Sequence, residues 1–367
     1  MGDNVLGTRL KITSFGESHG DVIGIVLDSI PAGLEIDMDY VRTQLRYRRP
    51  GQSRLTTNRT EHDEPVILSG VFKGKTTGAP LCIIIKNKDV DSSSYEKNKF
   101  RLRPSHCDFS AWKRYGGHAD YRGSGRFSGR ITAGFVMAGS IAKQVLKKYS
   151  IFIFAYTKSI GAVTDDKTYI IDDLSKYLEK REQSPVRALN DEKSKLMEEL
   201  IEHVKKENDS IGGTIKCMIY NVPPGIGSPV FNNLESNISK AIFSIPAIKG
   251  VEFGAGFKAS LMRGSQHNDP WIIKDGVIKT SKNDAGGIIG GISTGMPIEF
   301  TVAVKPTSTI GIPQNTVDIE TMQEIQVKFE GRHDPCIVPR AVVVVESMAA
   351  IALLDQMLME GKIPLVL

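Results

Sequence analysis

The sequence has 367 residues, 47 lysines and arginines against 42 aspartates and glutamates, and a formal net charge of +5. This length is sufficient for a large buried core, and the mild positive charge suits a small anionic ligand but is too weak for a nucleic-acid-binding surface. The four cysteines are too widely spaced for a zinc knuckle or a dense disulfide framework, which favours a reducing, cytoplasmic setting. The N-terminus lacks the apolar region of an export signal, and charged Glu346 interrupts the most apolar stretch, 341–354, so we expect no membrane span.

Short apolar runs rich in β-branched residues predict strands, in chain order, at residues 22–27, 66–72, 81–85, 151–156, 215–220, 298–304 and 341–345. Apolar residues at helical spacing predict helices at residues 131–149, 234–243 and 347–359. The first and third of these helices are rich in Ala, Gly and Met and carry few charges, so we expect them to be buried.

Turn sequences recur in the same order in the two halves of the chain. Residues 30–34 resemble 222–226, residues 77–81 resemble 294–298, and Gly125-Arg126 precedes one apolar helix as Gly331-Arg332 precedes another. This order predicts one domain, 1–367, built from pseudo-symmetric halves at roughly 1–160 and 210–367. Shared turn chemistry is the alternative explanation. Residues 164–209 have no counterpart and predict a charged, solvent-facing helical insertion.

Four polar segments bounded by glycine or proline hold most of the chemically active side chains. They are Gly16-Glu17-Ser18-His19-Gly20 and the segments 103–108, 305–309 and 331–336. Histidine can exchange a proton near neutral pH. A lone histidine in a glycine turn is usually a surface residue, but His106 and His333 recur in equally polar segments, which favours one site built from both ends of the chain.

Arginine-rich and glycine-rich turns indicate anion binding. Arg48 and Arg49 precede a Pro-Gly turn, where guanidinium groups can converge on phosphate or carboxylate, although a solvated helix face is the ordinary alternative. The turn 121–128 lies before a helix and could offer free N–H groups to phosphate, although Ser128 could serve only as an N-cap. The spacing around Gly70 and Gly74 does not fit a Walker loop, and that around Gly123 and Gly125 does not fit a Rossmann fingerprint.

These segments, together with residues 68–72, 251–254 and 263–266, resemble the chorismate synthase family over nearly the whole chain. The resemblance implies an α+β fold, a β-α-β sandwich of two pseudo-symmetric halves with buried apolar helices between two sheets. It implies a lyase that converts 5-enolpyruvylshikimate 3-phosphate to chorismate and phosphate by anti-1,4-elimination, the last step of the shikimate pathway. It also implies reduced FMN as cofactor and a homotetramer, with no nucleic-acid or membrane partner.

Carried over position by position, the resemblance makes His19 the acid that protonates the departing phosphate and His106 the group that serves the flavin ring, with Asp334 assisting proton removal through flavin N5. The substrate-binding residues that it implies are Ser18, Arg48, Arg49, Arg54 and Arg103. The flavin-binding residues that it implies are Arg126, Phe127, Ser128, Pro246, Ala247, Gly290, Lys305, Pro306, Thr307, Ser308, Thr309 and Arg332. No metal is implied.

The sequence leaves two other functions open. The family pattern has a serine and a glutamate where Phe127 and Ile131 stand, so a flavin-binding protein that has lost the chemistry is one alternative. An anion-binding regulatory or nucleic-acid module is the other, and steep salt dependence of binding without flavin quenching would identify it. Whether NADPH serves as reductant is not decided by the sequence.

Overall fold

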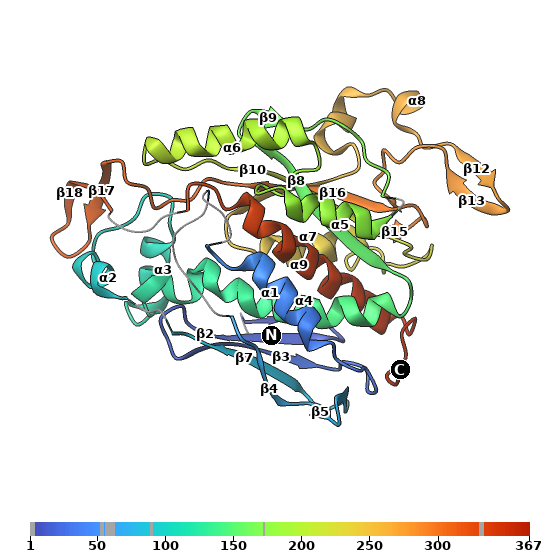
Figure 1. The fold of residues 1–367 in the computed structure, drawn as a ribbon, viewed down its shortest axis with the longest axis horizontal. Helices are drawn as coiled ribbons and strands as arrows, with labels where there is room; N and C mark the ends of the chain where they lie inside the picture. Colours follow the sequence, from blue (N-terminus) through green and yellow to red (C-terminus); the bar gives the residue numbers. More distant parts are fainter. Residues whose placement is uncertain (1–3, 52–54, 56–62, 89–90, 172, 330–333) are drawn as a thin grey trace.

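A computed structural model describes residues 4–51, 55, 63–88, 91–171, 173–329 and 334–367. Two five-stranded antiparallel sheets lie on either side of a layer of helices (Figure 1). The first sheet, in spatial order, is β1 (Val5–Leu6), β2 (Lys11–Gly16), β3 (Val22–Asp28), β7 (Leu81–Lys86) and β4 (Val66–Ser69). The second is β9 (Val163–Thr164), β8 (Phe152–Ile160), β10 (Gly213–Tyr220), β16 (Ile298–Val304) and β11 (Ile248–Phe253).

The two sheets have the same strand order. In each, the four longer strands lie in the spatial order first, second, fourth, third when numbered along the chain. In each, a register shift interrupts the pairing of the third strand with the fourth, between Ile67 and Ser69 in β4 and between Ile248 and Gly250 in β11. A helix follows the second strand, α1 (Met38–Arg48) in the first unit and α7 (Leu234–Phe243) in the second.

The helical layer centres on α4 (Thr132–Lys147) and α9 (Val338–Met359), which contact each other along their length. Helix α4 packs on β3 and α9 packs on β8, so the pair joins the two sheets (Figure 1). A Cβ atom added at Gly139 would lie 2.2 Å from Cβ of Ser347, so glycine permits the close approach of the two helices. Among the described helices α9 alone is long and apolar enough to cross a membrane, but 94% of its apolar window is buried, which makes it a core helix.

The remaining described elements are shorter or lie outside this core. The helices are α2 (Ser93–Lys97), α3 (Asp108–Tyr115), α5 (Leu174–Gln183), α6 (Asp191–Lys206) and α8 (Gly264–His267), and the 3-10 turns are η1 (Arg122–Phe127), η2 (Gly129–Ile131) and η3 (Gly256–Leu261). The hairpins are β5 (Val71–Phe72) with β6 (Lys75–Thr76), β12 (Trp271–Lys274) with β13 (Val277–Thr280), β14 (Ile288–Ile289) with β15 (Ile292–Ser293), and β17 (Gln314–Asp318) with β18 (Gln323–Val327).

The predicted strand at 341–345 is wrong, because these residues lie inside α9. The valine run 342–345 has strand propensity, but Pro339 lies in the first turn of the helix, where proline is favourable, and the run is enclosed on all sides, so packing decides its conformation. The helix predicted at 234–243 is confirmed as α7, and the helix predicted at 131–149 is confirmed with slightly shorter bounds as α4. The predicted strand 66–72 is divided at Gly70 into β4 and β5. The φ of +86° at Gly70 ends β4 and redirects the chain, and β5 then begins a separate hairpin.

The range 164–209 contains α5 and α6, which contact β8 in the second sheet. Two of its arginines do not face solvent, since Arg181 is 0% and Arg187 is 5% exposed. Arg181 donates to Glu346 Oε1 at 2.5 Å and to the carbonyl of Ala155 at 3.0 Å, and Arg187 donates to the carbonyl of Pro339 at 2.9 Å. The insertion therefore contributes cations to the core beside α9.

Candidate active site

A cavity of about 1180 Å³ opens at the end of the helical layer where loops from both sheets meet. Its wall combines the segment before and within α3, the turns η1 and η2, the residues after α7, the residues after β16 and the first turns of α9. Pockets for one small ligand occupy about 300–1000 Å³, so this volume suits two ligands side by side. The predicted site residues on the wall are Arg48, Arg103, His106, Arg126, Phe127, Ser128, Pro246, Ala247, Lys305, Pro306, Thr307, Ser308, Thr309 and Asp334.

His106 lies on the wall just before α3, in a loop where Ser105 has a φ of +58°. Its Nδ1 lies 2.7 Å from Oδ1 of Asp108. Arg103 donates to both carboxylate oxygens of Asp108, at 2.6 Å from Nη2 and 2.9 Å from Nε. Burial raises the pKa of Asp108, but the hydrogen bonds from His106 and Arg103 outweigh this and hold that pKa well below its ordinary value. The carboxylate is therefore ionised beside the imidazole.

His19 lies one layer behind the wall and is 7% exposed. Its Nδ1 lies 2.9 Å from Oγ of Ser92, and its ring meets that of Tyr95 edge-on with centroids 5.4 Å apart. Gly123, which lines the cavity, covers the imidazole so closely that an added Cβ would lie 2.5 Å from Nε2 of His19 and 2.8 Å from Oγ of Ser18. A glycine turn thus separates Ser18 and His19 from the cavity, and both belong to its second layer.

Two arginines on the wall share one buried carboxylate. Arg48, at the end of α1, donates to Oδ2 of Asp63 at 2.8 Å, and Arg130, in η2, donates to Oδ1 at 2.5 Å. Burial opposes ionisation of Asp63, but the two guanidinium groups outweigh it and hold its pKa below the ordinary value. Asp63 thereby fixes two cations at the same edge of the cavity.

The second sheet supplies the opposite wall. Lys305, at the end of β16, donates to the carbonyl of Ser105 at 3.0 Å, and Thr307 donates to the carbonyl of Asp334 at 3.0 Å. The side chain of Asp334 is ion-paired through Oδ2 with Arg340 in the first turn of α9. Arg340 also donates to the carbonyl of Arg48 at 3.0 Å, which ties α9 to α1 at the cavity.

Some predicted site residues have other positions or other partners. The guanidinium of Arg126 donates to backbone carbonyls of Gly16 and Ser14, so its side chain anchors β2. Ser128 caps η2 through the backbone N–H of Arg130, which agrees with the N-cap alternative for that turn. Gly290 lies in the β14–β15 hairpin and is not among the described residues that line the cavity. Arg54 and Arg332 lie outside the described residues.

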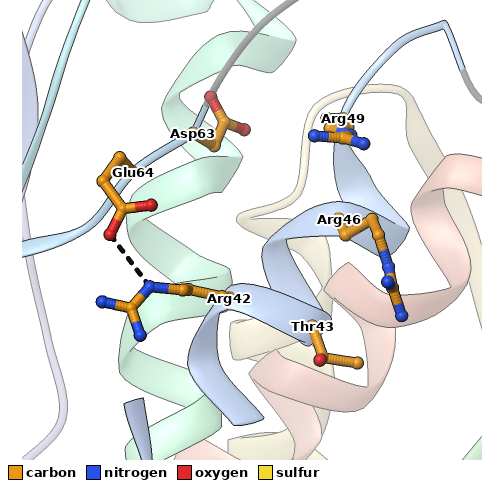
Figure 2. Close-up of a pocket in the computed structure, with 6 residues that line it drawn as sticks. All are labelled: Arg42, Thr43, Arg46, Arg49, Asp63 and Glu64. Carbon is orange, nitrogen blue, oxygen red and sulfur yellow. Dashed lines mark hydrogen bonds and ion pairs between the residues drawn. The ribbon is translucent and has the colours of Figure 1, made fainter. Parts of the chain in front are cut away.

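Arg49 lines a smaller pocket of about 210 Å³ on the outer face of α1 (Figure 2). Its other lining residues are Arg42, Thr43, Arg46, Asp63 and Glu64. Arg42 is paired with Glu64 at 2.9 Å and with Asp39 at 2.8 Å, so carboxylates already compensate much of the positive charge there. The large cavity is therefore the stronger candidate for an active site.

Sequence reasoning did not select Asp63, Tyr95, Asp108, Arg130 or Arg340, although all of them lie at or behind the wall. Asp108 falls within the segment 103–108, and its two-residue spacing from His106 is the signal that could have found it. Asp63 has no such signal, because its partner Arg48 is distant in sequence. The ligand atoms of His106, Cys107 and Asp108 lie within 4.8 Å of one another, but the Arg103 guanidinium already occupies Asp108 and opposes a second cation, so we assign no metal.

A deep cavity walled by arginine and lysine, with histidine and aspartate beside them, defines an enzyme that acts on a small, multiply anionic ligand. The family model described as chorismate synthase matches residues 10–358. The chain belongs to the chorismate synthase family. It is a phosphate-lyase that converts 5-enolpyruvylshikimate 3-phosphate to chorismate, the final step of the shikimate pathway.

Individual relatives agree with the family model over the full length. The chain is 49% identical to the chorismate synthase of Korarchaeum cryptofilum over 365 residues, covering 99% of this chain and 100% of that protein. It is 46% identical to that of Archaeoglobus fulgidus over 361 residues, covering 98% and 99%. A solved structure titled "Crystal Structure of Chorismate Synthase" is 31% identical, with a TM-score of 0.72 and coverage of 96% of this chain and 93% of that one.

The family uses reduced FMN, and the wall offers what such a group needs. Phe127 and Pro246 provide apolar surface for a flat ring system, and Phe127 is 37% exposed. Lys305 with the hydroxyls of Ser308 and Thr309 provides a cation and hydrogen-bond donors suited to a phosphate group. The residues present therefore fit FMN.

Proposed function

We propose that the large cavity binds 5-enolpyruvylshikimate 3-phosphate and reduced FMN side by side, and that the groups on its wall and directly behind it carry out the elimination. The observation that carries this proposal is the convergence of His106, Asp334 and the cations Arg48, Arg103, Arg130 and Lys305 on one cavity from both ends of the chain. When bound, reduced FMN would lend negative charge to the substrate as the phosphate leaves, which the reaction needs because the ring hydrogen is not acidic enough for a base alone to remove it.

The cations hold the substrate. Its phosphate and two carboxylates require fixed positive charge in a site with little water, which guanidinium groups provide as paired donors. Arg48 and Arg130 are held by Asp63, and Arg103 is held by Asp108, so each enters the reaction already oriented. Because these guanidinium groups are already oriented, the site does not have to reorganise when the substrate anions bind and react.

The titratable groups move protons. His19 protonates the departing phosphate from behind the Gly123 turn, with Ser18 beside it, and this role requires the turn to admit the phosphate to Nε2. Asp334, held by Arg340 through Oδ2, is the carboxylate that assists removal of the ring proton. His106 acts through Nε2, because Nδ1 faces Asp108. Each such acid or base contributes about a hundred- to ten-thousand-fold in rate.

The experiment is an anaerobic reaction of the purified chain with substrate and chemically reduced FMN, followed by phosphate release. We expect turnover that requires all three components and that falls by about a hundred- to ten-thousand-fold in His106→Ala and His19→Ala. Flavin binding without phosphate release would favour the protein that has lost the chemistry. Adding NADPH and oxidised FMN without other reductant, and following flavin absorbance, tests whether the chain reduces its own flavin.

We also propose that the chain forms one domain, a β-α-β sandwich of two pseudo-symmetric halves. The common strand order, the register shifts in β4 and β11, and the paired helices α4 and α9 support this proposal. Because β8 pairs with β10 in the second sheet, we place the boundary between α4 and β8, earlier than residue 160.

We propose a cytoplasmic homotetramer. Exposed apolar side chains cluster in sequence on one part of the second unit, where Phe257 is 82%, Leu261 is 86% and Ile273 is 79% exposed, and such surface is commonly covered in assemblies. The four cysteines are free, as expected in a reducing compartment. Light scattering of the purified chain tests the assembly, and a monomer would contradict it.

A further inference from the structure

Three side chains contact Nδ1 of His106: those of Asp108, Arg103 and, at the longest distance, 3.5 Å, Cys107. The two shorter contacts favour opposite roles for that atom. Oδ1 of Asp108 lies at 2.7 Å and can only accept a hydrogen, whereas Nη2 of Arg103 lies at 3.1 Å and can only donate one. If Nδ1 carries the hydrogen, Nε2 of the neutral ring is an acceptor. If Nδ1 is bare, the hydrogen is on Nε2 and the ring presents a donor to the cavity.

The contacts of Asp108 decide between these tautomers. Its carboxylate receives Arg103 Nε at 2.9 Å, Arg103 Nη2 at 2.6 Å and the backbone N–H of Arg103 at 2.9 Å. These donors stabilise the charged form, so the carboxylate has no hydrogen of its own to give. A contact of 2.7 Å between an ionised carboxylate and a ring nitrogen requires the hydrogen to be on the nitrogen.

The Arg103 contact does not compete with this arrangement. Nη2 gives its short hydrogen bond to Asp108, and Nη1 donates to Oγ of Ser124 at 3.0 Å, so the guanidinium is bound on both sides. Arg103 Nη2 and His106 Nδ1 both donate to Oδ1 of Asp108, and this shared acceptor brings the two nitrogens within 3.1 Å of each other. Sγ of Cys107 lies 3.5 Å from Nδ1, and burial raises the pKa of this thiol to about 11. A thiol is a weak donor and a weak acceptor, so this longer contact does not outweigh the 2.7 Å contact with the carboxylate. Lys305 holds the carbonyl of the neighbouring Ser105.

We propose that Asp108 is the positioning residue of His106: it fixes the ring as the Nδ1–H tautomer and directs Nε2 into the cavity. Within the described residues Nε2 has no hydrogen-bond partner, and His106 lines the cavity. Nε2 therefore accepts a proton, the resulting imidazolium is neutralised by Asp108 through Nδ1–H, and the same proton leaves from Nε2, while Asp108 stays ionised throughout. This inference rests on the proposed role of His106.

The direct test is nitrogen NMR of the full-length chain with 15N-labelled histidine, with the His106 signals assigned by their loss in His106→Gln. We expect the neutral ring of the wild type to be the Nδ1–H tautomer. In Asp108→Asn the amide can donate to Nδ1, so we expect the Nε2–H tautomer, and in Asp108→Glu a return to Nδ1–H. An Nε2–H ring in the wild type, or an unchanged tautomer in Asp108→Asn, would overturn the proposal.

Kinetics supply the second readout. Asp108→Asn should lower kcat by about a hundred- to ten-thousand-fold, because the ring is no longer held in the productive tautomer and the imidazolium loses its anion. Ser124→Ala is the matched control, since it removes another partner of Arg103 without touching His106 and should change KM more than kcat. Equal kcat losses in the two variants would show that Asp108 acts only through Arg103.

The two experiments separate this inference from the proposed function. If the wild type has no turnover but shows the Nδ1–H tautomer, and Asp108→Asn changes it, the proposed function fails while the positioning by Asp108 stands. If the wild type turns over and the tautomer does not depend on Asp108, the positioning fails alone.

Discussion

Nζ of Lys305 donates a hydrogen bond to the carbonyl oxygen of Ser105 across 3.0 Å, although the two residues are 200 positions apart. The bond joins the end of β16 in the second sheet to the loop that carries His106. It lies in the cavity wall, where the two halves of the chain meet. The position of the His106 loop therefore depends on how the second sheet packs against the first half of the chain.

Replacing Lys305 by Met should weaken binding of oxidised FMN by about tenfold or more, because it removes a charged hydrogen bond and a cation from the wall. Burial, together with the nearby charge of Lys249, lowers the pKa of Lys305 below its ordinary value. Flavin fluorescence titration measures the affinity. Lys249→Met is the matched control, since Lys249 is exposed and outside the described wall, and equal losses in the two variants would argue against a local role for Lys305.

Gly123→Ala should lower kcat by at least about a hundredfold, the contribution of one displaced acid. An added Cβ would lie 2.2 Å from Cδ2 of His19, and the φ of +56° at this position disfavours alanine. Gly129→Ala is the comparison, because Gly129 also lines the cavity but has no atom within 4 Å of its added Cβ. Steady-state kinetics decide the matter: a Gly123→Ala enzyme as active as Gly129→Ala would remove His19 from the reaction.

Asp63→Asn should raise KM for the substrate and lower the free energy of unfolding by about 3–5 kcal/mol at neutral pH, since it leaves Arg48 and Arg130 without their shared carboxylate. The pKa of Asp63 is lower in the folded chain, so its stabilising contribution is complete above its unfolded pKa of about 4 and is lost as the pH falls through the folded value. Denaturant unfolding at several pH values measures this. If the difference in unfolding free energy between wild type and Asp63→Asn became larger as the pH falls, Asp63 would not be the ionised partner of the two arginines.

Glu346→Gln should destabilise the chain by about 3–5 kcal/mol, because Lys143 and Arg181 would keep buried charges without their anion. Burial raises the pKa of Glu346, but these two cations outweigh it, so the group is ionised and its contribution is lost only in acid. Chemical denaturation of the variant, with exposed Glu324→Gln as control, tests this. Equal midpoints for the two variants would show that the buried network does not hold the insertion to the core.

Local patterns were sufficient for much of the fold. The strands at 215–220 and 298–304 and the helix α7 follow from apolar spacing within the segment, and the structure confirms them. The valine run in α9 misled the same reasoning, because burial on all sides removes the helical periodicity on which the prediction depends. Likewise, nothing local indicates that Arg181 in a charged helix is fully buried, since its partner Glu346 is 165 positions away.

The site residues show the same contrast between what local sequence indicates and what depends on contacts between distant residues. His106 and its neighbours were visible because they are close in sequence, and the resemblance placed Lys305 and Asp334 beside them. Arg126 illustrates what sequence cannot give: its residue type suits phosphate, but the fold directs its guanidinium to the carbonyls of β2. Arg130, four residues on, lines the cavity instead and is held there by Asp63, which is 67 positions away in the sequence.

A crystal structure of the chain with oxidised FMN and 5-enolpyruvylshikimate 3-phosphate tests the central claim most directly. The account predicts both ligands inside the large cavity, the ring system beside Phe127 and Pro246, and the substrate anions within hydrogen-bond distance of Arg48, Arg103 and Arg130. Ligands bound outside this cavity, or His106 remote from both of them, would contradict it.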